Sequence, residues 1–270
     1  MPWNADIAYR IGVDHEECQD HAHMAENTKG KLICVSDGCS SSLNSDWGSR
    51  LLTSAATSRW KSELCFEEIA EDAIFTAHQV ILNVPNVSKM SALDATLILA
   101  SVVNDICSII MWGDGTYIIV NNDKTWEIHT VEFKSNAPEY LSYLVNPPRH
   151  EQYKVAGDHT KVITTATYSA ENVLTGLTIV ESVKQFESWI ISNVDTLLIC
   201  SDGISSFTHK KALTVTERYS ADEVAKDLIA IPNRNGDFLK RRWKKMRQKF
   251  DKTGISHSDD FAVAALVKVP

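Results

Sequence analysis

The sequence predicts an α+β protein in which antiparallel sheets are covered by helices. Strand-like blocks are separated by helices, which come as a pair at residues 46–64 and 66–83, and a further helical pattern runs through 221–250. The regular alternation of strand and helix that produces parallel sheets is missing. The 270 residues show no repeat of roughly 20 to 50 residues and suffice for a sizeable core, so we expect one domain over residues 1–270.

The first half of the chain predicts two strands, two helices and then a further group of strands. Residues 5–13 and 31–35 are strand-like, and Ser36-Asp37-Gly38 stops the second run. Amphipathic helical spacing covers the first helix pair. Further apolar runs are joined by short turns rich in Asn, Asp and Gly, which predicts an antiparallel meander of strands at 95–103, 106–112, 116–120 and 126–133.

The second half begins with residues 134–160, which hold three of the seven prolines and little periodicity. We expect a surface excursion there. Beyond it the pattern predicts strands at 161–168, 196–200 and 261–269, and helices at 180–189 and within 221–250. Ser201-Asp202-Gly203 ends the strand at 196–200, as Ser36-Asp37-Gly38 ends the strand at 31–35.

Composition restricts the class of protein. The net charge of −8 disfavours a nucleic-acid or membrane-surface protein, so we expect neither kind of partner. The chain begins without a signal-like segment and has no apolar run near the ~20 residues of a membrane span, so we expect a cytoplasmic location. Six cysteines form no C-x-x-C pair, and Cys34, Cys107 and Cys200 lie in apolar runs. Reduced, mostly buried thiols are therefore expected.

Aspartates recur at the ends of the predicted strands, as Asp37, Asp114, Asp202 and the pair Asp259-Asp260. Any one of them could simply belong to a turn. Together, carboxylates from several strand ends would repel one another unless a cation neutralised them. Mg²⁺ and Mn²⁺ prefer such all-oxygen sites. The set therefore indicates a metal site.

These aspartates stand in blocks that resemble the protein phosphatase 2C family of metal-dependent Ser/Thr phosphatases, in particular its compact bacterial-style branch. The resemblance spans residues 5–269, and its strength lies in the order of the blocks. They are Cys18-Gln19-Asp20, Ser36-Asp37-Gly38-Cys39 with Ser45-Asp46-Trp47-Gly48, Asp94-Ala95-Thr96-Leu97, Trp112-Gly113-Asp114-Gly115, Cys200-Ser201-Asp202-Gly203 and Ser258-Asp259-Asp260-Phe261.

The resemblance implies a four-layer sandwich, two antiparallel sheets flanked by pairs of helices, with two Mg²⁺ or Mn²⁺ ions at one end. By the same resemblance Asp37 bridges both ions and the Gly38 carbonyl binds the second. Asp202 and Asp259 complete the first ion's ligands, and Asp20 holds its water. The implied activity is hydrolysis of phosphoserine and phosphothreonine in a phosphorylated protein substrate, by water that the two ions activate.

The sequence departs from the family pattern at three places near the site. His15 stands where many relatives carry a phosphate-binding Arg, and it could bind phosphate more weakly or simply be a surface residue. Cys39 replaces a His proposed as general acid in the animal enzymes, and a thiol is a poor substitute. Asp260 replaces a frequent Asn, and its role stays open.

A third ion, which relatives often bind, is expected to be weak or absent. Asp114 and Asp202 occupy two of its ligand positions, but the position four residues after Asp202 is Ser206. A neutral hydroxyl there removes a charged oxygen ligand. Asp114 then either serves this weak site or acts as a turn or outer-shell residue.

The segment 240–252 contains eight Lys and Arg residues interleaved with Trp243, Met246 and Phe250. It is either a solvated helix face packed through its apolar residues or a surface that attracts acidic or phosphorylated substrates.

The sequence offers two alternatives to this function. A haloacid-dehalogenase-like loop around Asp114 fails, because Trp112 occupies the nucleophile position. A catalytically weakened phosphatase-fold protein that binds or regulates phosphoproteins is the alternative, suggested by His15 and Cys39 and opposed by the retained aspartates.

Overall fold

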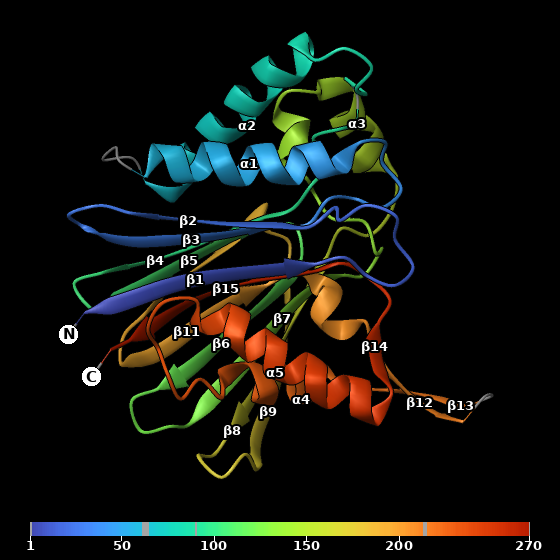
Figure 1. Cartoon of the computed structure of the whole chain (residues 1–270). Helices are drawn as coiled ribbons and strands as arrows, with labels where there is room; N and C mark the ends of the chain where they lie inside the picture. Colours follow the sequence, from blue (N-terminus) through green and yellow to red (C-terminus); the bar gives the residue numbers. More distant parts are fainter. Residues whose placement is uncertain (1, 61–64, 90, 213–214, 270) are drawn as a thin grey trace.

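The computed structural model describes residues 2–60, 65–89, 91–212 and 215–269, and arranges them in four layers (Figure 1). Two large antiparallel sheets pack face to face, and each carries a pair of helices on its outer face. Helices α1 (Ser45–Arg59) and α2 (Phe66–Asn83) cover the five-stranded sheet, while α4 (Ala221–Ile229) and α5 (Phe238–Thr253) cover the seven-stranded sheet. The expected α+β sandwich is confirmed.

The strand order within each sheet is fixed by antiparallel pairing. The seven-stranded sheet runs β1 (Trp3–Arg10), β15 (Phe261–Lys268), β11 (Val194–Cys200), β6 (Gly115–Asn121), β7 (Trp126–Phe133), β8 (Lys161–Tyr168), β9 (Leu174–Ser182). The five-stranded sheet runs β10 (Phe186–Ile191), β5 (Ile106–Trp112), β4 (Leu97–Val103), β3 (Gly30–Ser36), β2 (His21–Glu26). A small third sheet contains β13 (Val215–Arg218), β12 (Phe207–Ala212) and β14 (Ile255–His257).

The central strands are mainly apolar because both of their faces are buried. In β3, Leu32 and Cys34 pack under α1 and α2, while Ile33 and Val35 meet the opposite sheet. Successive side chains of a strand point to opposite faces, so a strand between two packed layers needs apolar residues at every position. The continuous apolar run over 32–35 follows from this double burial.

Strand register places the ends of several strands, and the loops that follow or precede them, at one end of the sandwich. Ser36 at the end of β3 pairs with His21 at the start of β2, and Cys200 at the end of β11 pairs with Thr116 near the start of β6. Arg10, at the end of β1, pairs with Phe261, where β15 begins. The loops after β1, β3, β5 and β11 and before β2, β4 and β15 therefore gather at this end.

Three expectations about single elements are corrected. The helix expected at 180–189 is wrong, because these residues lie in β9 and β10, whose Val, Ile, Phe and Trp residues favour strands. The expected meander is split, because the chain passes from β5 in one sheet to β6 in the other through Gly113, at φ +88°. The single helical pattern over 221–250 is two helices, separated by a stretch that contains Pro232 and Gly236.

Other features agree with expectation or lie outside the described residues. All six cysteines are free, and Cys34, Cys107 and Cys200 are buried. Residues 61–64, expected to end the first helix, lie outside the described part of the chain. Among the described residues, none of the helices combines the length and apolar character needed to cross a membrane.

The segment 134–160 contains the short 3-10 helix η1 (Leu141–Leu144) and helix α3 (Pro147–Val155). Its Leu141, Tyr143 and Tyr153 are buried. The fully buried carboxylate of Asp94 ties the segment to the sandwich, because it accepts hydrogen bonds from Ser42 (2.8 Å) and Ser142 (2.7 Å) and an ion pair from Arg149.

Replacing Arg149 with Met should destabilise the protein. The change leaves the buried Asp94 carboxylate without its cation, which should lower the free energy of unfolding by about 2–3 kcal/mol. This cost is smaller than that of breaking a fully buried pair because the Arg149 side chain is 26% exposed. Urea unfolding measures this cost. Glu151→Ala, on an exposed surface pair of the same helix, is the control and should change stability by less than about 0.5 kcal/mol. Equal stability of the two variants would contradict the assigned role of this ion pair.

Candidate active site

Acidic side chains from separate segments meet at the end of the sandwich where the loops gather. A hollow of about 280 Å³ is lined by five of them, Asp37, Asp114, Asp202, Asp259 and Asp260. Gly38 lines the same hollow, and a neighbouring hollow of about 410 Å³ shares Asp114, Asp202 and Asp259. The structure thus brings together every strand-end aspartate that the sequence singles out.

Asp37 is held by the junction between β3 and β4. Its backbone N–H donates to the Thr96 hydroxyl (3.0 Å), and its carbonyl accepts from the Thr96 N–H (2.8 Å). The next residue, Gly38, donates to the Gln19 carbonyl (3.2 Å), which brings the segment before β2 against the same loop. Asp20 is consequently beside Asp37, with its side chain turned toward Asp37 and Ser201.

Asp202 follows β11 directly and opens the 3-10 helix η2 (Asp202–Ser205). Ser201 anchors this turn to β15, because its N–H donates to the Ala262 carbonyl (3.0 Å) and its hydroxyl accepts from the Ala262 N–H (3.0 Å). At Gly203 an added Cβ would lie 1.7 Å from the Asp260 carbonyl oxygen. Only glycine permits this approach, so the turn and the Asp259-Asp260 segment pack closely.

Asp260, whose role the sequence left open, organises the loop between β1 and β2. Its buried carboxylate accepts from the backbone N–H groups of Gly12 (2.8 Å) and Gln19 (2.5 Å). It also lies 3.1 Å from Nδ1 of His15, whose Nε2 is 3.3 Å from Asp259. No local sequence signal marks these long-range contacts, because they depend on how the first and last strands pair.

His15 is thus placed between two carboxylates. Burial acts against its charged form, but the hydrogen bond and charge of Asp260, together with Asp259 and Asp20, outweigh burial and raise the pKa of His15. Both ring nitrogens already face carboxylate oxygens. Contact with a phosphate would require one of these partners to be exchanged.

The carboxylates are crowded enough to change their acidity. Burial, followed by the charges of Asp20 and Asp202, raises the pKa of Asp37 well above its ordinary value. Burial likewise raises the pKa of Asp20 to about 7 and that of Asp114 to about 8, and Asp202 adds to both effects. The pKa of Asp259 is raised by burial and then by Asp202. Ionising all these groups together is therefore costly without added positive charge.

The donor set fits a hard divalent cation. Every donor is an oxygen, and Asp20 Oδ2 is buried without a hydrogen-bond partner among the described residues. Within residues 2–60, 65–89, 91–212 and 215–269, no three His, Cys, Asp or Glu side chains form a ready-made ligand group. The carboxylates thus share a hollow but do not yet converge on one point.

Two further residues line this hollow, and their positions carry little or no signal in the sequence. Cys39 Sγ lies 3.1 Å from the Ser41 hydroxyl. Burial raises the pKa of the Cys39 thiol, but hydrogen bonds with Ser41, Tyr140 and Ser42 outweigh burial and lower it. Tyr140, from the segment 134–160, lines the hollow and was not anticipated. This segment therefore contributes a wall of the site.

The position expected for a third ion has only some of the ligands that such an ion would need. Ser206 lines the second hollow with Asp114 and Asp202. Its hydroxyl donates to the Gly203 carbonyl (2.8 Å), so it is used within its own turn.

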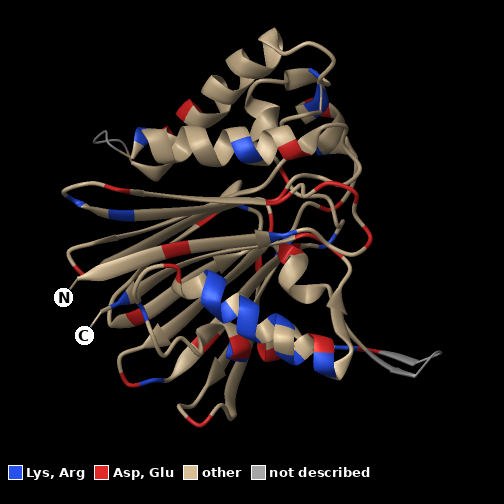
Figure 2. Ribbon diagram, in the orientation of Figure 1, with Lys and Arg blue, Asp and Glu red and all other residues tan. Residues whose placement is uncertain are grey.

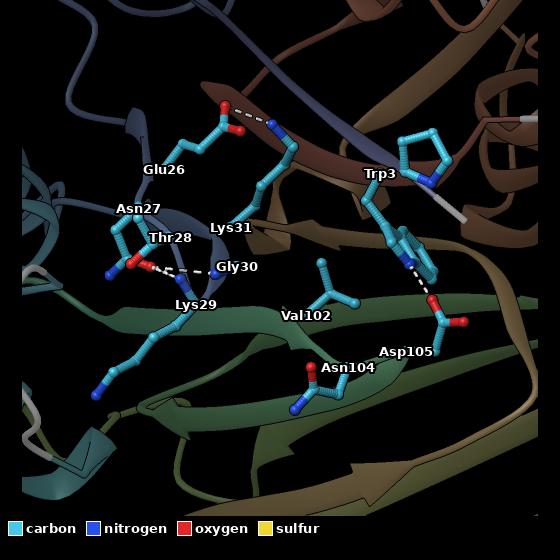
Figure 3. A pocket seen from close by; sticks show the side chains of 11 residues that line it. Trp3, Glu26, Asn27, Thr28, Lys29, Gly30, Lys31, Val102, Asn104 and Asp105 are labelled. Carbon is cyan, nitrogen blue, oxygen red and sulfur yellow. Dashed lines mark hydrogen bonds and ion pairs between the residues drawn. The ribbon is translucent and has the colours of Figure 1, made fainter.

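A larger hollow of about 560 Å³ lies at the opposite ends of β3, β4 and β5 (Figure 3). Its polar groups include paired ones, since Lys31 lies 2.5 Å from Glu26 and the Trp3 indole donates to Asp105 at 2.7 Å. It lacks the crowded carboxylates of the other end. The acidic hollow is therefore the candidate active site.

Comparison with solved structures relates this fold to bacterial phosphatases. The Staphylococcus aureus serine/threonine phosphatase Stp1 superimposes with a TM-score of 0.56 at 13% identity, over 100% of this chain and 96% of Stp1. The S. agalactiae serine/threonine phosphatase gives 0.57 at 15% identity, over 99% of this chain and 100% of that one. At such identities the likeness concerns the fold.

Sequence comparison identifies the family. No curated protein matches the chain. The family profile described as protein phosphatase 2C matches residues 12–235, which is more than half of the chain. The matched range includes Asp20, Asp37, Asp114 and Asp202 and ends before Asp259. The chain therefore belongs to the protein phosphatase 2C family of phosphoprotein phosphatases.

Proposed function

We propose that this phosphatase hydrolyses phosphoserine and phosphothreonine esters of proteins with the help of two Mg²⁺ or Mn²⁺ ions. One observation carries the proposal. Asp20, Asp37, Asp202 and Asp259 come from four separate segments and meet at one end of the sandwich, where burial and neighbouring carboxylates disfavour the charged forms of Asp20, Asp37 and Asp259. Divalent cations would remove that penalty.

Asp37, the Gly38 carbonyl, Asp202 and Asp259 would hold the ions, and Asp20 would orient water beside them. The ions would supply positive charge toward the phosphate and lower the pKa of water. Asp260 holds the loop that carries His15 and Gln19 against the site. We assign His15 to positioning Asp259 and Asp260, and phosphate contact is the alternative role.

Cys39 favours a second candidate function. Its half-buried thiol stands at the position of the His proposed as general acid in the animal enzymes. Thiols protonate a leaving alkoxide poorly at neutral pH, so slow turnover of alkyl phosphates is expected. A protein whose turnover is negligible would act as a phosphoprotein-binding module, and the assays below separate the two.

Activity should depend on Mg²⁺ or Mn²⁺. Hydrolysis of a chromogenic aryl phosphate is expected to disappear after exhaustive chelation and to return when Mn²⁺ is added back. Activity that survives chelation unchanged would contradict the proposal, and activity absent under every metal condition would favour the binding module.

Asp37→Ala and Asp202→Ala should each lower kcat by more than about 100-fold. Losing a residue that only supports a metal ligand typically costs up to about 100-fold, so a larger loss indicates a direct ligand. Both variants should stay folded, because each removes a charge from a crowded acidic cluster. Steady-state kinetics at saturating Mn²⁺ and a thermal melt measure the two effects. Glu16→Ala, an exposed acid on the neighbouring loop, is the control and should retain kcat. Near-normal kcat in either aspartate variant would show the ligand assignment to be wrong.

Two well-occupied ions near Asp37 are expected in a crystal soaked in millimolar Mg²⁺, with a weak or absent third ion. Ser206→Asp adds a carboxylate in the second hollow and should strengthen binding there, which calorimetric Mn²⁺ titration of the variant and the parent can detect. A fully occupied third ion between Asp114 and Asp202 in the unaltered protein would refute this expectation.

A further inference from the structure

Helix α5 presents a dense basic surface on an acidic protein. Figure 2 shows Lys and Arg gathered along this helix, and the chain as a whole carries a net charge of −8. Packing is provided by the opposite face, where Trp243, Met246 and Phe250 are buried, as one of the two sequence interpretations expected. Like charges on neighbouring turns repel one another. The exposed basic residues are Lys240, Arg241, Lys244, Lys245, Arg247, Lys249 and Lys252.

Only part of this charge is neutralised within the chain. Lys249 lies 2.6 Å and Arg242 3.5 Å from Asp227 of α4. Arg247 is 3.9 Å from Asp251, both on the exposed face. Lys244 has no ion pair or hydrogen bond with any residue that the structure describes, so its charge is available to a partner.

An apolar groove of about 300 Å³ runs beside this helix. Two of its apolar side chains are well exposed, Ile11 at 43% and Val13 at 67%. Its polar lining comprises two cations, Arg10 and Arg247, and the acid Asp251, with Ser256 and His257. Its remaining apolar lining is Trp243, Phe250 and Ile255. A space of this size accommodates one large apolar side chain of a partner.

The groove and the candidate active site share two stretches of backbone. The Val13 N–H donates to the His257 carbonyl (3.1 Å), and the Asp14 N–H donates to the Ser258 carbonyl (3.3 Å). His15 follows Val13 by two residues, and Asp259 follows His257 by two residues. The side chains of His15 and Asp259 belong to the candidate active site and lie 3.3 Å apart. A segment seated in the groove is thus held near the site.

Helix geometry decides which basic residues face the groove. Arg247 lines it, and at about 100° per residue Lys244 is about 60° away around the helix axis, whereas Lys245 is about 160° away. Lys245 therefore lies on the far side of the same helix. Arg247 and Lys245 carry the same charge on opposite sides of the helix, so substitutions at these two residues compare the effect of position alone.

We propose, building on the function proposed above, that this groove docks an apolar side chain within an acidic segment of the phosphoprotein substrate. The acidic side chains lie over Arg247 and Lys244, and the apolar one contacts Ile11 and Val13. Attraction between opposite charges would supply steering, and apolar contact would supply residence time.

The surroundings of the groove favour a peptide over other anions. Trp243 and Phe250 are 5% and 4% exposed, so they offer no face on which nucleic-acid bases could stack. The exposed acids Asp14, Glu16 and Glu17 on the loop beside the groove would repel an anionic membrane surface. Because these three acids would also repel the acidic part of the peptide, that part must lie over α5, away from the phosphorylated residue.

The test measures binding of a fluorescent, unphosphorylated peptide whose single leucine is followed by a run of glutamates. Fluorescence anisotropy in chelator gives the Kd for the protein and three variants. Arg247→Glu and Val13→Asn should each weaken binding by about tenfold, through the charge and the apolar contact respectively. Lys245→Glu, an equal change of charge on the far side, should alter Kd by less than about twofold because solvent screens it.

Three outcomes would overturn the proposal: the unaltered protein does not bind the peptide, Lys245→Glu weakens binding as much as Arg247→Glu, or a single-stranded RNA or an anionic vesicle binds more tightly than the peptide. Hydrolysis of an aryl phosphate by the same preparations should be unchanged in all three variants. If that hydrolysis is absent from the unaltered protein, the proposed function fails, while the anisotropy measurement still decides whether the groove docks peptides.

Discussion

Repulsion between carboxylates is the constraint on which the structure depends. Asp20, Asp37, Asp202 and Asp259 are delivered to one place by strands that pair in fixed register, and Asp114 joins them at the turn where the chain crosses between sheets. The raised pKa values of Asp20, Asp37, Asp114 and Asp259 show that the arrangement disfavours their charged forms. The apolar sandwich supplies the rigidity that holds these groups together, and added cations would turn the penalty into binding energy.

A second layer of contacts fixes the loops around the acids. Asp260 binds both ends of the β1–β2 loop, and Asp94 attaches the segment 134–160 through Ser142 and Arg149. Both are buried carboxylates with full sets of partners, which makes them suited to positioning. Their role differs from that of Asp20, one of whose oxygens is buried without a partner among the described residues.

A feature of the structure could be predicted from the sequence where a local residue pattern encodes it, and could not where it depends on tertiary contacts. Strands such as β3 and β11 could be predicted because burial on both faces demands continuous apolar residues. The segment 180–189 could not, because it holds only the last three residues of β9 and the first four of β10, and neither run is long enough to display a period of two. The aspartates of the site were recognisable from their blocks, with Asp20 resting on family resemblance. The roles of Asp260 and Tyr140 arise from tertiary contacts that no local pattern encodes.

On this interpretation, the crowded carboxylates hold divalent cations. Thermal unfolding of the intact protein as a function of Mn²⁺ concentration tests it directly, because a ligand that binds only the folded state raises the melting temperature. The melting temperature should rise steadily with Mn²⁺ concentration, and this rise should be lost when Asp37 and Asp202 are both replaced by Ala. A melting temperature that does not change up to millimolar Mn²⁺ would contradict it.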